Sequence, residues 1–170
     1  NYQANISALK QIGARDVIGI AAVGSLLEAF APGTLALPDD YIDYSFGRAH
    51  TFFDGENAHV AHLDCSQPYS NTLRSQILAA GKSAQIAILA TGVYGCTQGP
   101  RLETPAEIRR LLRDGCTMVG MTGVPEAPLA AELGLNYACL AVSVNWAAGL
   151  GSGDIHAEIE QSLEEGITAV

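Results

Sequence analysis

Four short segments of the sequence combine glycines with side chains that can bind a polar ligand. They are AAVGSL at 21–26, TQGPRLETPAE at 97–107, VGMTGVPEA at 119–127 and LAVSVNWAAG at 140–149. The carboxylate of Glu103, the hydroxyl of Thr122 and the amide of Asn145 could together hold a small molecule by hydrogen bonds. Each segment lies at or just beyond the C-terminal end of a predicted buried strand, where open α/β sheets collect ligands. We therefore expect the four segments to meet in one crevice.

Taken one at a time, these motifs also have simple structural explanations. The Gly24-Ser25 pair could be a plain turn between a strand and a helix. Glu103 could complement a helix dipole, and Asn145 could be a turn residue. Met121 and Thr122 fit a core position and a helix cap. Three histidines could be ordinary loop residues: His50, His59 and His62.

The elements that must position these segments alternate between strands and helices. Apolar runs predict strands at 17–23, 35–37, 41–44, 85–94, 118–121 and 137–144. Helical patterns cover 2–12, 69–80, a stretch beginning at 104–107, 126–133 and about 156–168, and a long loop at 45–68 has no clear period. This alternation predicts a layered α/β fold with a central, largely parallel mixed sheet flanked by helices.

The clearest helix start follows Glu103 directly. Thr104 can cap the helix, Pro105 suits its first turn, and Glu107 can close a capping box. The inward face would consist of Ile108, Leu111 and Leu112.

Length and composition exclude several classes of protein. The 170 residues fit a single domain, and 48% hydrophobic against 16% charged residues excludes intrinsic disorder. Nine basic and 18 acidic residues give a net charge of −9, which disfavours nucleic acid and membrane surfaces as partners. Small anions remain possible ligands, because backbone N–H groups can bind them. The chain begins at Asn1, without methionine and inside a predicted helix, as a fragment would.

The cysteines argue against a metal site. Cys65, Cys96, Cys116 and Cys139 form no C-x-x-C pair and no Cys/His cluster with zinc spacing. We expect buried free thiols in a reducing cytoplasm. No signal sequence is recognisable, and the apolar stretches end well short of the roughly 18 residues that a membrane span needs.

The motifs also occur in a recognisable order. G-S-L comes first, then G-P-R-L-E-T, then G-M-T-G-V-P-E-A, and then an asparagine at the end of the next strand. This order resembles the trimeric purine nucleoside phosphorylases, as do the opening NYQANISALK and the stretch PDDYIDY with RAHTFFDG. The segment GVYGCTQGPRLET most resembles the branch that acts on methylthio-nucleosides, and within that branch the enzymes that act on S-methyl-5′-thioinosine. The resemblance extends from Asn1 to about Gly166.

The resemblance implies a phosphorylase-type fold and a phosphorolytic reaction. Members of this family split a purine nucleoside with inorganic phosphate into the free base and a pentose 1-phosphate. No metal or organic cofactor is implied, since phosphate is a co-substrate, and the expected assembly is a homotrimer or a hexamer of two trimers. Family members begin with about 60 further residues that carry phosphate ligands, and the resemblance implies that a short C-terminal part is absent here as well.

The resemblance assigns the purine to two residues. Asn145 matches the position that bonds N7 and O6, and Glu103 matches the carboxylate that faces N1. Members that accept 6-amino purines carry Asp at the positions of Asn145 and Ala147, and a small hydroxyl residue at that of Glu103. This chain therefore has the set expected for 6-oxopurines.

Other positions match contacts to the sugar and phosphate. Met121 matches the residue that packs on the ribose, and Thr122 a hydroxyl that contacts phosphate. The backbone of Ala22 matches a phosphate or sugar contact beside Gly24, which we count in the substrate-binding set. Leu102 stands where other members place a phenylalanine against the base.

Two histidines point to different 5′ groups. His62 matches a histidine that, in methylthioadenosine phosphorylases, crosses the subunit interface to the 5′ substituent. His156 falls where ordinary purine nucleoside phosphorylases bond the 5′-hydroxyl. We favour S-methyl-5′-thioinosine, with inosine or guanosine and methylthioadenosine as alternatives. A related nucleosidase and a silent nucleoside-binding subunit are rival functions.

Overall fold

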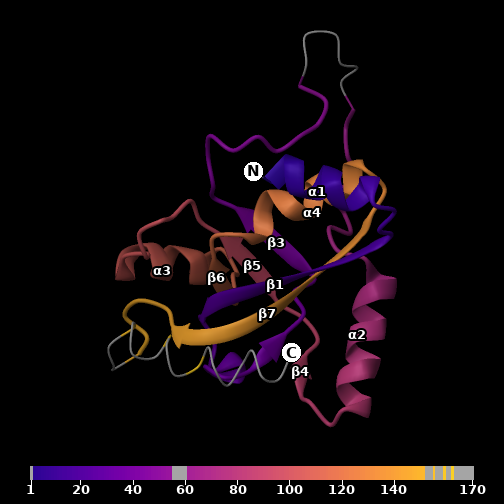
Figure 1. Cartoon of the computed structure of the whole chain (residues 1–170). Helices are drawn as coiled ribbons and strands as arrows, with labels where there is room; N and C mark the ends of the chain where they lie inside the picture. Colours follow the sequence, from indigo (N-terminus) through magenta and orange to yellow (C-terminus); the bar gives the residue numbers. More distant parts are fainter. Residues whose placement is uncertain (1, 55–60, 152–154, 156–158, 160–161, 163–170) are drawn as a thin grey trace.

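The computed structural model describes residues 2–54 and 61–151 and the single positions 155, 159 and 162. Its elements in chain order are α1 (Tyr2–Gln11), β1 (Asp16–Ser25), a short 3-10 helix (Glu28–Phe30), β2 (Leu35–Ala36), β3 (Asp40–Asp43), α2 (Asn71–Ser83), β4 (Ile88–Leu89), β5 (Val93–Cys96), α3 (Pro105–Arg113), β6 (Met118–Gly120), α4 (Gly123–Glu132) and β7 (Asn136–Trp146). Figure 1 shows them arranged around one central sheet.

The described strands form a mixed sheet in the order β3-β5-β6-β1-β7-β2-β4. Four of its pairings are parallel, namely β1–β7, β2–β4, β3–β5 and β5–β6. The pairings β1–β6 and β2–β7 are antiparallel. The predicted α/β fold with a largely parallel mixed sheet is thus confirmed.

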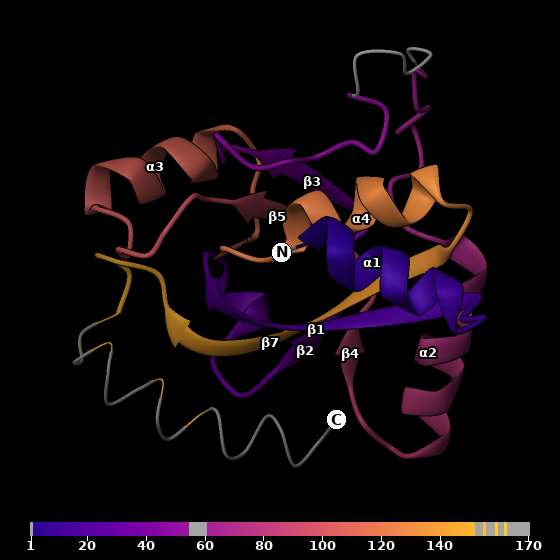
Figure 2. The same cartoon turned by 45° about the horizontal axis from the view of Figure 1, so that its top comes forward.

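Alternate residues of β7 face two different hydrophobic layers. Tyr137, Cys139 and Ala141 pack in the cluster that includes residues of α1 and α4. The residues between and beyond them, Leu140, Val142 and Val144, pack with residues of α2. Accordingly α1 and α4 lie together on one face of the sheet and α2 lies on the other (Figures 1 and 2). Since both faces are covered, the run 137–142 of this strand is apolar without interruption, as its sequence predicted.

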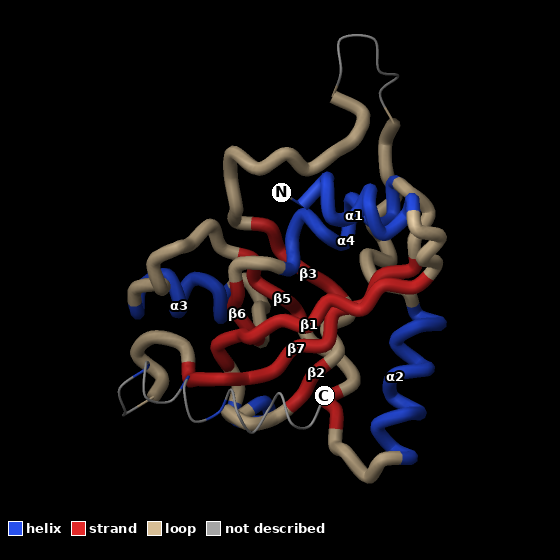
Figure 3. The backbone as a smooth tube through the Cα atoms, in the orientation of Figure 1, coloured by secondary structure: helices blue, strands red, loops and turns tan. Residues whose placement is uncertain are grey.

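The strand predicted at 85–94 is two strands. Ile88–Leu89 pairs with β2 at one edge of the sheet, whereas Val93–Cys96 pairs with β3 and β6. The backbone N–H of Gly92, between them, donates to Asp39 Oδ1 at 2.8 Å, and this contact fixes the break. Only three residues separate β4 from β5, so the sheet must curl to bring its two ends within reach (Figure 3).

The remaining elements agree with the sequence within a few residues, with some corrections. Val124 and Pro125 have non-helical dihedral angles inside α4, so its regular part begins near the predicted residue 126. Cys65 is exposed, contrary to the expectation of four buried thiols, because it lies in the loop before α2. The predicted last helix, including His156, falls almost wholly outside the described residues. In the described part of the chain, no helix has the length and apolar character needed to cross a bilayer.

Candidate active site

A cavity of about 280 Å³ lies where β1, β6 and β7 end. Seven of the nine residues predicted to act on substrate line it: Ala22, Gly24, Leu102, Glu103, Met121, Thr122 and Asn145. The other lining residues are mainly apolar: Val23, Val119, Gly120, Val144, Ala147, Ala148, Ile155 and Ile159. The expected crevice is therefore present, and the four sequence segments meet in it.

Strand register explains why the segments converge. Gly24 is the Cα partner of Asn145 across the parallel β1–β7 pair and of Val119 across the antiparallel β1–β6 pair. The register shifts between Val23 and Gly24, because Val144 of β7 has no Cα partner in β1. A Cβ atom on Gly24 would lie 3.3 Å from Val119 Cγ1 and 3.4 Å from Asn145 Nδ2. The glycine thus lets the ends of the three strands approach closely around the cavity.

Asn145 lies within β7 and is not a turn residue, contrary to the simpler explanation. Its side chain is almost buried, at 7% exposure, and Nδ2 donates to the carbonyl oxygen of Trp146 at 2.7 Å. An amide has two N–H donors and one carbonyl acceptor. The Trp146 bond uses one N–H, so a second donor and the acceptor remain for a ligand.

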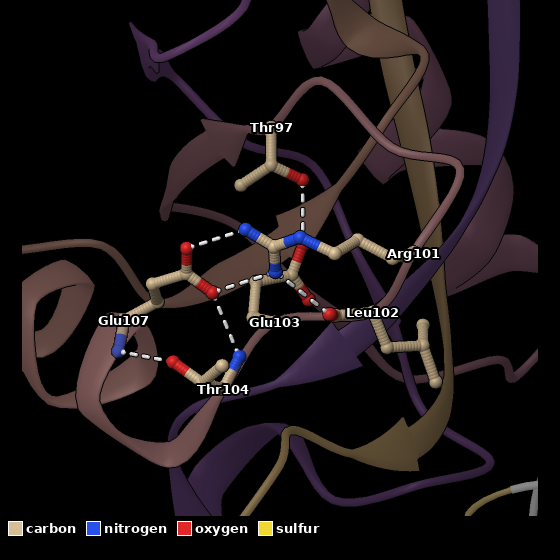
Figure 4. Close-up of polar contacts among 6 residues, drawn as sticks. All are labelled: Thr97, Arg101, Leu102, Glu103, Thr104 and Glu107. Carbon is tan, nitrogen blue, oxygen red and sulfur yellow. Dashed lines mark hydrogen bonds and ion pairs between the residues drawn. The ribbon is translucent and has the colours of Figure 1, made fainter.

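Glu103 is not needed to cap the helix that follows it. Thr104 and Glu107 form the predicted capping box of α3, and Arg101 binds the Glu107 carboxylate through two N–H donors at 2.7 and 2.9 Å (Figure 4). The Arg101 hydrogen bonds, followed by the Thr104 backbone N–H, lower the pKa of Glu107 to about 2. Glu107 therefore supplies the negative charge at the helix start. Glu103 is left half-buried at the cavity, and its Oε1 accepts a 2.6 Å hydrogen bond from Thr97.

Met121 and Thr122 form the wall that follows β6. The Thr122 hydroxyl makes no capping hydrogen bond to α4 and the residue is exposed, so this hydroxyl can meet a ligand. The backbone N–H of Thr122 donates to the Tyr94 hydroxyl at 3.4 Å. Burial raises the pKa of Tyr94, which therefore stays protonated near neutral pH.

Arg48 joins the two loops that carry these residues. Its Nη2 donates to the carbonyl oxygens of Thr97 and Gln98, both at 3.0 Å. Its Nη1 donates to the carbonyl oxygens of Met121, at 2.8 Å, and Val124. The guanidinium is thus occupied by backbone acceptors and does not line the cavity as a free charge.

A second cavity, of about 250 Å³, borders Glu103 as well. Its lining includes Tyr44, Phe46, Thr97 and the Arg101–Glu107 pair. None of the predicted sugar, phosphate or leaving-group contacts reaches it, since Met121, Thr122 and Asn145 line only the first cavity. The first cavity is therefore the better candidate for a nucleoside.

Comparison with known proteins identifies the family. The sequence-family model described as the phosphorylase superfamily matches residues 1–170. The chain belongs to the phosphorylase superfamily. It is 54% identical over 151 residues to a probable S-methyl-5′-thioinosine phosphorylase of Xanthomonas campestris pv. campestris, a match covering 89% of this chain and 60% of that protein. It is 39% identical to the 6-oxopurine nucleoside phosphorylase of Pyrococcus furiosus, over 97% of this chain and 64% of that protein.

Solved structures of the superfamily share the fold. The methylthioadenosine phosphorylase of Schistosoma mansoni in complex with adenine superposes with a TM-score of 0.94 at 25% identity, covering 99% of this chain and 66% of that one. The same enzyme with tubercidin gives a TM-score of 0.91 at 27% identity, covering 98% and 66%. The chain thus spans about two thirds or less of the length of these relatives.

Of the two predicted 5′ residues of this superfamily member, only His62 lies among the described residues. His62 is exposed, in the stretch before α2, and does not line the cavity formed by the described residues. His156 lies outside the described residues. Both assignments therefore remain predictions. From the sequence, Arg48 is a candidate for positive charge near the crevice, but its guanidinium binds backbone carbonyl oxygens of two loops instead. Sequence reasoning missed the role of Thr97, although its hydroxyl, just ahead of the GPRLET motif, was a visible signal.

Gly99 offers a direct test of how tightly the two loops pack in this superfamily member. Its φ is +65°, and a Cβ atom there would overlap Met121 Sδ. Gly99→Ala should strain the backbone by about 1–2 kcal/mol and also displace Met121, so the KM of a substrate that binds in the first cavity should rise by roughly tenfold. Steady-state kinetics and the melting temperature measure the two effects.

Gly134→Ala is the matched control, with a φ of +66° and no atom within 4 Å of the added Cβ. It should lose similar stability and keep the wild-type KM. Equal KM values for the two variants would show that Met121 does not contact the substrate.

Proposed function

We propose that the protein splits S-methyl-5′-thioinosine with inorganic phosphate into hypoxanthine and a pentose 1-phosphate. The observation that carries this proposal is the convergence of Glu103 and Asn145 on one cavity with Met121 and Thr122. The relatives named as S-methyl-5′-thioinosine phosphorylases, at 53–54% identity, support the choice of substrate. Inosine or guanosine, which differ in the 5′ group or the base, are the nearest alternatives.

Glu103 would select the base. An ionised carboxylate only accepts hydrogen bonds, so it suits the N1–H of hypoxanthine. Adenine presents a bare N1 acceptor, and two facing acceptors would cost about 1–3 kcal/mol, or roughly tenfold to a hundredfold in selectivity. Ala147, buried at 3% exposure in the cavity wall, adds no competing charge.

Asn145 and Thr122 would bind the two groups that take part in cleavage of the glycosidic bond, the leaving purine and the phosphate. The free N–H of Asn145 would donate to the departing purine as it gains negative charge. The exposed hydroxyl of Thr122 and the backbone of Ala22 would contact inorganic phosphate, which is the second reactant. The reaction needs placement and hydrogen bonding and no metal or organic cofactor.

The assembly and the cellular setting form part of the proposal. We propose a homotrimer in which the exposed His62 of one subunit reaches the 5′ group in a neighbouring site. Cys96, Cys116 and Cys139 are buried free thiols, which suits a reducing compartment such as the cytoplasm.

Base release from S-methyl-5′-thioinosine, inosine and methylthioadenosine, with and without phosphate, tests this function. Hypoxanthine release should require phosphate, and adenine release should be at least tenfold slower. Release that continues without phosphate would indicate a nucleosidase. Binding without turnover would indicate a silent subunit.

A Glu103→Ser variant tests the base assignment within the same assay. It should lose most of its rate on the two inosine-type substrates and show a selectivity for them that is lower by roughly tenfold to a hundredfold. Unchanged rates on both inosine-type substrates would remove Glu103 from the site.

A further inference from the structure

One oxygen of the Glu103 carboxylate is held by a hydrogen bond. Thr97 Oγ1 donates to Glu103 Oε1 at 2.6 Å, the short distance expected of a hydroxyl bound to an ionised carboxylate (Figure 4). Among the described residues, this is the one hydrogen bond that the Glu103 side chain makes. The other oxygen, Oε2, is left to accept a hydrogen bond from a ligand.

Thr97 is itself fixed by the sheet and by Arg48. It follows β5 directly, and its backbone N–H donates to the carbonyl oxygen of Gly120, at the end of β6, at 2.8 Å. Its own carbonyl oxygen accepts from Arg48 Nη2 at 3.0 Å. The hydroxyl is therefore presented from a rigid position, whereas Glu103 lies on the turn before α3.

The alternative acceptor for this hydroxyl is weaker. The Gly120 carbonyl oxygen lies 3.4 Å from Thr97 Oγ1, against 2.6 Å for the carboxylate. A hydroxyl has one proton to donate, so the geometry favours Glu103. The neighbouring cation, Arg101, makes its hydrogen bonds to Glu107 and to the Leu102 carbonyl oxygen, which leaves Thr97 as the group that orients Glu103.

Thr97 acts from outside the proposed nucleoside cavity. It lines the second cavity, with Tyr44 and Phe46, and does not line the first. Glu103 borders both cavities, so Thr97 contacts the carboxylate without lining the cavity that contains Asn145. Its effect on a ligand must therefore pass through Glu103.

We propose that Thr97 is a positioning residue that sets the selectivity between 6-oxo and 6-amino purines by holding one oxygen of Glu103. This inference rests on the proposed function, because it concerns the same base. With Oε1 held, Oε2 stays an oriented acceptor for N1–H. Without the hydroxyl, the carboxylate can rotate, and the preference for a base that donates at N1 weakens.

The test compares two substitutions at this position. Thr97→Val keeps the shape and removes the hydroxyl, and it should lower the ratio of kcat/KM for inosine over adenosine by roughly tenfold. Thr97→Ser keeps a hydroxyl and should restore most of the ratio. The ratio does not depend on the fraction of folded enzyme, so a purely structural role would not change it.

Thr117→Val is the matched control. Thr117 Oγ1 bonds the Val93 backbone and lines neither cavity, so its loss should leave the ratio unchanged. A wild-type ratio in Thr97→Val, or no rescue in Thr97→Ser, would overturn the inference.

A binding measurement keeps this test independent of turnover. The chain has a single tryptophan, Trp146, next to Asn145, and its fluorescence can report hypoxanthine and adenine binding. The ratio of the two dissociation constants should change in Thr97→Val as the kinetic ratio does. If the wild-type protein releases no base, the proposed function fails, while an unchanged binding ratio in Thr97→Val would overturn the role of Thr97 alone.

Discussion

Replacing Arg48 with methionine should lower kcat/KM for the nucleoside by about a hundredfold, because a shift of about 1 Å in catalytic groups has effects of that size. Arg48 donates to carbonyl oxygens of the 97–98 and 121–124 segments. The first segment leads to Glu103, and the second contains Met121 and Thr122. Methionine fills the space of the stem but makes none of these bonds, so the two walls of the cavity should separate. Steady-state kinetics on the purified protein measure the loss.

Arg74→Met separates this effect from a general loss of stability. Arg74 also donates from Nη2 to two backbone carbonyl oxygens, those of Leu37 and Ala90, but it lines no part of the nucleoside cavity. Both variants should melt at lower temperature, and only Arg48→Met should lose kcat/KM per folded molecule. Arg48→Lys keeps the positive charge but lacks the planar guanidinium and its several N–H donors, so it should recover part of the rate. Wild-type kinetics in Arg48→Met would contradict the positioning role.

Replacing Asn145 with alanine should lower kcat by about 10²–10³-fold, as removal of one donor to a developing negative charge does elsewhere. The side chain is almost buried at the end of β7 and keeps one N–H for a ligand. Because the negative charge on the purine grows as the bond breaks, kcat should change more than KM. Single-turnover rates of base release measure this step.

Asn136→Ala is the control at the opposite end of the same strand. Asn136 is exposed and donates to Asp16 Oδ1 at 2.7 Å. It is the same residue type as Asn145 and belongs to the same strand, but it lies far from the cavity lining. Its loss should leave kcat unchanged. A kcat near the wild-type value in Asn145→Ala would exclude this residue from the chemistry.

Much of the site could be predicted because strand ends are visible in a sequence. The apolar run of β7 indicates a strand buried between two layers, and the structure confirms it. The similar run of β1 predicts the same burial, but that prediction is wrong for one face, where Ile18 and Ile20 are exposed. Gly24 and Asn145 lie at the ends of these two runs. Parallel pairing then places the two residues opposite each other. The capping box at Thr104 likewise depends on local spacing and was predictable for that reason.

The remaining features depend on contacts that leave no pattern in the sequence. Arg48 lies in a loop without periodicity, and its acceptors are backbone carbonyl oxygens that any residue would provide. The Thr97–Glu103 bond depends on the shape of the turn between them. The break at residues 90–92 arises because β4 and β5 pair with different strands, β2 and β3 respectively. The sequence does not become polar at this point, so its composition does not reveal the break.

A crystal structure of the protein with hypoxanthine and phosphate would test the assignment of the nucleoside cavity most directly. Glu103 borders two cavities, and only one of them also contains Asn145 and Thr122. The base should lie in the cavity at the ends of β1, β6 and β7, with N1–H donating to Glu103 Oε2 and the N7 side at Asn145. A base bound instead between Tyr44 and Arg101, or one that makes no contact with Asn145, would contradict the assignment.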